Sequence, residues 1–215
     1  RRIRHAGAGR DDAYGGRQMT RPRKLTIIFV TGLVAIMALA VSLYTRMDNV
    51  AQSRTANLGG PFTLTDDYGK PVTEASLKGK PSVIYFGYTF CPEVCPTTLL
   101  DLTHLIAKLG PDADKANYVF VTIDPQRDNV KAMHDYVSSF DKRIRGYTGT
   151  PQQIAQIAKE YGVYYAREPG GGENYAMDHS TRVYLMDAGG HYVESIAYQE
   201  PEASALAKLK NLVAL

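Results

Sequence analysis

The sequence has little of what marks a disulfide-stapled, collagen-like or disordered protein. It holds two cysteines in 215 residues, too few for disulfides to replace a hydrophobic core. Its 11 prolines and 19 glycines are near average usage, which excludes collagen-like repetition. With 44% hydrophobic and 22% charged residues, the chain suits one well-packed domain of ordinary size and an additional segment. The two cysteines therefore need a chemical explanation.

Most of the sequence also lacks an excess of positive charge. Residues 1–24 form a basic tail with eight Arg or Lys against two Asp, a net +6, whereas the remaining 17 basic and 20 acidic residues give −3. A nucleic-acid-binding module would carry its basic residues on the folded surface. We therefore expect no nucleic-acid partner. A basic tail that leads into an apolar run is typical of a membrane protein.

No charged residue occurs between Leu25 and Tyr44. A helix of this length, at ~1.5 Å per residue, spans roughly the 30 Å hydrocarbon layer. We expect one transmembrane helix over residues 25–45, with its basic flank in the cytoplasm or matrix. Residues 38–40, Ala-Leu-Ala, resemble a signal-peptidase site, but the apolar run continues beyond them, which favours a retained anchor. The expected location is the bacterial inner membrane with the domain in the periplasm, or the mitochondrial inner membrane facing the intermembrane space.

The other boundaries follow from local composition. Met19 and the basic residues after it are typical of a membrane-protein start, so residues 1–18 could be untranslated, and we expect no function for them. Residues 46–60 are polar and are interpreted as a linker. The folded domain is expected over residues 61–215.

The pattern within that domain indicates its fold class. Runs rich in β-branched and aromatic residues predict strands at 82–87, 118–123, 183–186 and 192–196. Apolar stripes at helical spacing predict helices at 99–109, 130–140, 154–161 and 202–213. Residues 62–73 carry the turn signal of a hairpin. This order predicts an α/β, thioredoxin-like fold with an added N-terminal β-hairpin, preceded by the transmembrane helix.

Cys91 and Cys95 directly follow the predicted strand at 82–87, and ligands of open α/β sheets bind at the carboxyl ends of strands. Because Pro96 has no backbone N–H, we expect the next helix to begin there, with Cys95 near its cap and Cys91 on the preceding turn. The helix dipole would favour the thiolate, which is the nucleophilic and metal-binding form. A structural disulfide is the alternative, although so small a loop would contribute little entropy.

The cysteine pair could serve dithiol exchange or metal binding, and a third ligand would favour metal. Four of the five histidines are expected in the tail or on the surface, namely His5, His104, His134 and His191. His179 precedes the predicted strand at 183–186, in a loop that faces the cysteine turn of a thioredoxin-like fold. Two thiolates and one imidazole suit Cu(I), or Cu(II) with a further ligand. Structural zinc normally takes four protein ligands.

Several polar residues could support such a site. Asp178 either orients the imidazole or is a surface residue. Asp124 and Arg127 end the second predicted strand, where they could tune the copper, dock a partner or simply stabilise the loop. Asp128 is interpreted as a cap of the following helix, and Met177 is a soft donor that is more typical of packing.

Three ordered motifs resemble the Sco/SenC family of membrane-anchored copper proteins. They are residues 85–89 leading into 91–96, residues 124–128, and residues 178–180, and the resemblance covers most of 61–215. It implies copper ligation by Cys91, Cys95 and His179. It also implies a metallochaperone, not an enzyme, that delivers copper to the dinuclear copper site of cytochrome c oxidase subunit II, or that keeps the cysteines of that subunit reduced. A second copper chaperone could be the donor.

An alternative function uses the same cysteines without His179. It is a membrane-tethered thiol-disulfide oxidoreductase or redox sensor. Thioredoxins, however, have two residues between their cysteines and a cis-proline before the later strand. This chain has three residues between Cys91 and Cys95, and Ser180-Thr181 near the later strand. General disulfide reductase activity is therefore not expected.

Overall fold

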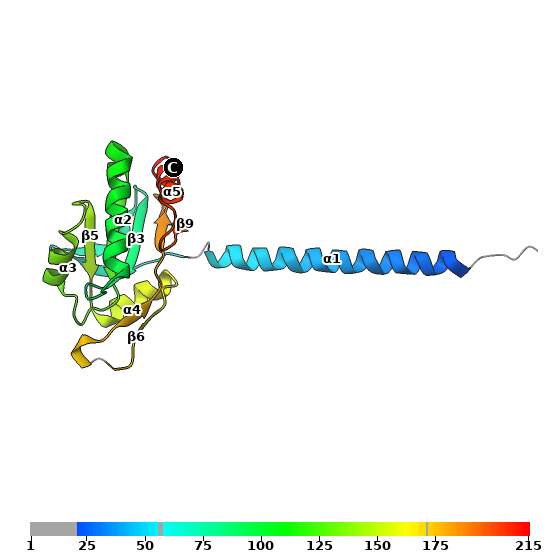
Figure 1. The fold of residues 1–215 in the computed structure, drawn as a ribbon, viewed down its shortest axis with the longest axis horizontal. Helices are drawn as coiled ribbons and strands as arrows, with labels where there is room; N and C mark the ends of the chain where they lie inside the picture. Colours follow the sequence, from blue (N-terminus) through cyan, green and yellow to red (C-terminus); the bar gives the residue numbers. More distant parts are fainter. Residues whose placement is uncertain (1–20, 56–57, 171) are drawn as a thin grey trace, which may run out of the picture. The chain divides into compact units, whose positions relative to one another are not determined.

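The structure is a computed structural model that describes residues 21–55, 58–170 and 172–215 (Figure 1). The chain divides into two units, residues 1–50 and 51–215. Most of α1 (Arg21–Thr55) belongs to the first unit, and its segment Ile27–Arg46 is long and apolar enough to cross a membrane. The helix continues through residues 46–55, which the sequence assigns to a linker. The expectations for residues 1–18 lie outside the described residues.

The second unit is built on a seven-stranded sheet in the order β2-β1-β5-β4-β3-β8-β9. Its strands are β1 (Thr63–Asp66), β2 (Pro71–Thr73), β3 (Ser82–Gly87), β4 (Asn117–Thr122), β5 (Ile144–Thr148), β8 (Val183–Met186) and β9 (Tyr192–Ile196). Strands β3, β4 and β5 are parallel, and the other pairings are antiparallel. The hairpins β1–β2 and β8–β9 confirm the predicted turns, and the whole confirms the thioredoxin-like α/β fold.

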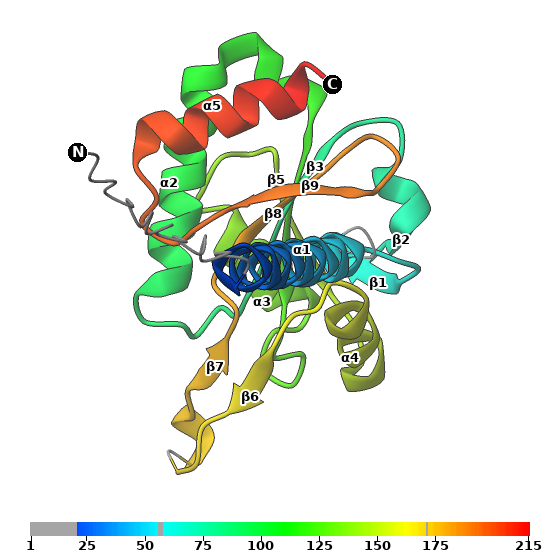
Figure 2. The same cartoon turned by 90° about the vertical axis from the view of Figure 1, so that its right-hand side faces the viewer.

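Four helices pack around this sheet, α2 (Val94–Leu109), α3 (Val130–Val137), α4 (Pro151–Glu160) and α5 (Glu202–Val213). Short 3-10 turns occupy Glu74–Leu77, Gly110–Lys115 and Gly172–Asn174. Helix α5 packs across α2, as Figure 2 shows, and α3 packs against β5. Successive residues of β3 serve opposite faces. Tyr85 faces the thiol of Cys95 in α2. Phe86 packs on the other face against the ring of Tyr161, just after α4.

A short antiparallel ribbon, β6 (Tyr165–Arg167) and β7 (Met177–His179), forms a second sheet that the sequence does not predict. Figures 1 and 2 both show this ribbon projecting from the body of the domain. Its second strand, β7, ends at His179. The position of that imidazole therefore depends on how the ribbon is held.

The start of α2 corrects one prediction. The helix begins at Val94 and not at Pro96, so Cys95 lies inside the first turn. The first four N–H groups of a helix have no intrahelical partner, and for that reason a proline at the third position is tolerated.

Candidate metal centre

Three donor side chains from two distant parts of the chain meet at the carboxyl end of β3. The donor atoms of Cys91, Cys95 and His179 all lie within 4.8 Å of one another. The Cys95 Sγ and His179 Nε2 atoms are 3.6 Å apart. The described residues contain no other such group of three or more His, Cys, Asp or Glu side chains. The predicted meeting of the imidazole with the cysteine turn is thereby confirmed.

The backbone between β3 and α2 places the two sulfurs. The amide of Cys91 donates to the carbonyl of Tyr88 (3.3 Å), which closes the turn after the strand. The amide of Cys95, near the helix start, donates to Cys91 Sγ at 3.3 Å. A Cβ atom at Gly87 would lie 2.6 Å from Cys95 Sγ, so the sulfur occupies space that only glycine leaves open.

The two sulfurs are chemically unequal. A hydrogen bond from the Cys95 thiol, together with one from the Cys95 amide, lowers the pKa of the Cys91 thiol. The same thiol pairing together with burial raises the pKa of the Cys95 thiol. Cys91 is partly exposed, whereas Cys95 is fully buried. Cys91 is thus the thiolate that an incoming group meets first, and Cys95 holds a proton until a metal or an electrophile replaces it.

The imidazole is held with the correct nitrogen toward the sulfurs. His179 Nδ1 donates to the carbonyl oxygen of Ser180 at 2.8 Å, which leaves the Nε2 lone pair facing Cys95. Asp178 is exposed, because neighbouring strand residues point to opposite sides. Asp178 is thus the surface residue that was one of its two predicted roles, and the Ser180 carbonyl makes the orienting contact instead.

Two tyrosines line the centre, although the sequence pattern does not single them out. The Tyr85 hydroxyl lies 3.6 Å from Cys95 Sγ, and burial raises the pKa of Tyr85. The Tyr88 ring meets His179 edge-on, with centroids 5.9 Å apart. Both residues belong to the aromatic run that leads into the cysteines, and alternation along a strand is the only sequence signal that could have indicated their roles.

The loop after β4 lies beside the centre without joining the donor cluster. Asp124 is buried and pairs with Arg127 Nε. Asp128 was predicted to cap α3, but the cap is Asn129, whose side chain accepts from the Ala132 amide. The Asp128 carboxylate is instead buried under the cysteine turn, where it accepts from the Thr89 amide (3.0 Å) and hydroxyl (2.6 Å). Burial raises the pKa of Asp128.

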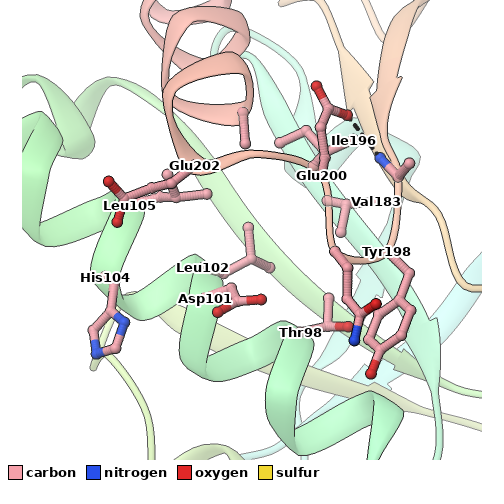
Figure 3. Close-up of a pocket in the computed structure, with 13 residues that line it drawn as sticks. Thr98, Asp101, Leu102, His104, Leu105, Val183, Ile196, Tyr198, Glu200 and Glu202 are labelled. Carbon is pink, nitrogen blue, oxygen red and sulfur yellow. Dashed lines mark hydrogen bonds between the residues drawn. The ribbon is translucent and has the colours of Figure 1, made fainter.

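A cavity of about 110 Å³ lies on another side of α2, between this helix, β9 and the start of α5. Figure 3 shows Thr98, Asp101 and Leu102 along the helix, with Tyr198 and Glu200 across the opening. Thr98 follows Cys95 by less than one helical turn, but no donor of the cluster lines this cavity. His104 is exposed here, as predicted.

Known proteins match this chain over the domain that holds the donor cluster. The family model described as SCO1/SenC matches residues 50–214. The Saccharomyces cerevisiae mitochondrial protein SCO2 is 40% identical over 159 residues, 73% of this chain and 53% of that protein. A SCO2-like protein of Rickettsia conorii is 34% identical over 194 residues, 86% of this chain and 95% of that protein. Relatives are thus mitochondrial or bacterial.

Solved structures of Sco proteins are also similar to this chain. Bradyrhizobium japonicum ScoI with copper bound has a TM-score of 0.68 and 44% identity, over 72% of this chain and 99% of that one. Yeast Sco1 with copper bound has a TM-score of 0.69 and 37% identity, over 74% of this chain and 89% of that one. The chain spans about half the length of the yeast SCO2 protein and 42% of an Arabidopsis thaliana SCO1 homologue.

Proposed function

Since the chain belongs to the SCO1/SenC family, we propose that it is a copper chaperone for cytochrome c oxidase assembly, with Cys91, Cys95 and His179 as the copper ligands. The single observation that carries this proposal is the convergence of three soft or borderline donors, within 4.8 Å of one another, from residues 84 positions apart. Copper is the cargo in this proposal. The chain's part is to bind it and to pass it on.

The donor set fits copper in number and type, and the distance between its Cys95 and His179 donors fits as well. Ligand atoms about 2.0–2.3 Å from one ion in a trigonal arrangement lie roughly 3.5–4 Å from each other. The 3.6 Å between Cys95 Sγ and His179 Nε2 agrees with this spacing. Two sulfurs and one imidazole suit Cu(I), and an added water or side chain would suit Cu(II). Structural zinc would be one protein ligand short.

The unequal sulfurs support a direction of transfer. Cys91 is partly exposed and Cys95 is buried, so an acceptor thiolate can reach the metal from the Cys91 side. We place the acceptor at the dinuclear copper site of cytochrome c oxidase subunit II, and the donor in a second copper chaperone. The anchor would hold the domain at the bacterial inner membrane on the periplasmic side, or at the mitochondrial inner membrane facing the intermembrane space.

Copper titration of the reduced protein tests the ligand set. We expect one copper per chain, with affinity reduced at least about tenfold by His179→Ala and further by Cys91→Ser or Cys95→Ser, because each change removes one donor. His191→Ala is the matched control, since His191 is exposed and pairs with Asp187. Undiminished affinity of His179→Ala in a competition titration would overturn the ligand set.

A second function has an observation of its own in favour. The low pKa of Cys91 and the protonated partner Cys95 are the arrangement of a dithiol reductant. The Cys91 thiolate would attack a disulfide of the oxidase subunit and release one thiolate. Cys95 would then pass its proton to the thiolate already released and attack the Cys91 sulfur, which releases the second thiolate and leaves a Cys91–Cys95 disulfide. Reduction of an oxidised subunit II peptide by metal-free protein, undiminished in His179→Ala, would support this activity.

A further inference from the structure

The ribbon β6–β7 has little of its own to hold it in place. Each strand has three residues, and the ribbon belongs to a sheet separate from the main one. Isolated two-stranded hairpins are marginal in water. Because His179 ends β7, other contacts must set its distance from the cysteine pair.

Tyr175, two residues before β7, supplies the first of these contacts. Its side chain is 7% exposed, and its hydroxyl donates to Asp124 Oδ1 at 2.7 Å. Asp124 is a fixed anchor, because its own amide donates to Thr122 Oγ1 and its carbonyl accepts from the amide of Asp128. A hydrogen bond to a buried carboxylate is among the stronger ones in proteins.

The ring of Tyr175 also lies between two guanidinium groups. Arg127 lies 3.6 Å from the ring centroid and Arg167, on β6, lies 3.7 Å from it. Arg127 in turn faces the ring of Phe90 at 4.6 Å, and Phe90 directly precedes Cys91. Stacked cations and rings therefore run from the cysteine turn to β6 and to the segment just before β7.

A second tie lies beside His179 itself. The amide of Met177 donates to the Tyr88 hydroxyl at 3.3 Å, and the Tyr88 ring meets His179 edge-on. Tyr88 therefore connects the end of β3 to β7. The contacts of Tyr175 and Tyr88 together set the distance between the imidazole and the two sulfurs.

We propose that Tyr175 is a positioning residue that clamps the β6–β7 ribbon onto Asp124 and Arg127, and so holds His179 within bonding range of the cysteine pair. The clamp rests on the proposed function only where it concerns copper. Opening it would withdraw the imidazole and leave copper on two thiolates. The clamp thus sets how firmly the third ligand holds the cargo.

Tyr175→Phe removes the hydroxyl and keeps the ring. We expect about a tenfold loss of copper affinity in a competition titration, because the ribbon is released from Asp124. Tyr165→Phe is the matched control, since Tyr165 pairs directly with His179 in the ribbon and its hydroxyl makes no hydrogen bond among the described residues. It should bind copper within twofold of the wild type.

A double-mutant cycle separates positioning from general destabilisation. If Tyr175 acts through His179, Tyr175→Phe should change copper affinity less than twofold in a His179→Ala background. Equal losses in both backgrounds, or no loss in the wild-type background, would overturn the proposal. Should Tyr175→Phe fail to fold, Arg127→Lys keeps the charge but loses the planar face over Tyr175, and the same pattern is expected.

Hydrogen exchange on the metal-free protein tests the clamp without copper. We expect the amides of Met177 and Glu168, which donate to Tyr88 Oη and the Ala176 carbonyl, to exchange faster in Tyr175→Phe but not in Tyr165→Phe. Unchanged exchange would contradict the clamp. If the wild type bound no copper while exchange responded as expected, the proposed function would fail and the clamp would stand.

Discussion

At the residue scale, Gly87 is the position with the least room beside the sulfurs. An added Cβ would lie 2.6 Å from Cys95 Sγ and 2.8 Å from Phe120 Cε2, well inside van der Waals contact. Gly87→Ala should therefore displace Cys95 or bend β3. We expect a stability loss of about 1–3 kcal/mol and a copper affinity at least about tenfold lower, measured by denaturant unfolding and competition titration.

Gly146→Ala separates the two effects. Gly146 lies in the same sheet, and a Cβ there would meet Met133 and Val137 at 3.2–3.3 Å but neither cysteine. It should cost stability and leave copper affinity unchanged. If both variants bound copper as the wild type does, the space beside Cys95 would have no bearing on the metal.

The residues that meet at the centre were predictable to different degrees. Cys91, Cys95 and His179 follow from their places after the strand at 82–87 and before the strand at 183–186, because a thioredoxin-like fold brings those two ends together. The contacts around them do not. The Ser180 carbonyl, and not Asp178, orients the imidazole, and the Tyr175 hydroxyl donates to Asp124. Both contacts depend on side-chain orientation, which a pattern of residue types does not specify.

At the element scale, segments with a clear apolar pattern were predictable, and segments without one were not. The bounds of β3, β8, β9 and α5 agree with the prediction, since each has a clear apolar pattern. Strand β5 and the ribbon β6–β7 were missed. The ribbon strands have three partly buried or exposed residues each, too few for a period to be recognised.

The loop between β9 and α5 is strained and held by one carboxylate. Gln199 has φ of 56°, the only positive φ outside glycine in the part of the chain that the structure describes. The Glu200 carboxylate accepts from the Ala197 amide, the Ser204 hydroxyl and Lys208 Nζ. A left-handed residue persists only where its surroundings fix it, and this network does so.

The same network gives the loop a pH dependence. Although burial opposes the shift, the hydrogen bonds and Lys208 lower the pKa of Glu200 to about 2, from 4.5. A lowered folded-state pKa means that the stabilisation is present above pH ~4.5 and is lost as the pH falls toward ~2. We expect Glu200→Gln to cost about 1 kcal/mol at pH 7, allowing for solvent screening.

Urea unfolding between pH 2 and 7 measures this effect. The stability difference between the wild type and Glu200→Gln should shrink as the pH falls through 4.5. Glu194→Gln is the control, because Glu194 lies 3.9 Å from the same lysine and has none of the other contacts. A difference that stayed constant down to pH 2 would contradict the role of the Glu200 charge.

At the scale of the whole molecule, the apolar segment and the donor cluster belong to different units of the chain. Segment Ile27–Arg46 has the length and composition to span a bilayer, and the donor cluster lies wholly within residues 51–215. Membrane attachment and copper binding should therefore be separable by substitution.

Leu33→Lys with Ile36→Lys places two charges near the middle of the span. Each costs about 2.5–3.5 kcal/mol for insertion at the helix centre, so we expect the chain to leave the membrane fraction in alkaline carbonate extraction and still bind copper. Leu100→Lys with Val193→Lys adds the same charge at exposed apolar positions of the domain, and should leave the chain in the membrane. Retention of the first variant would show that the helix is not the anchor. Wild-type protein recovered in the soluble fraction, with its N-terminus at Val41, would instead show cleavage after Ala40.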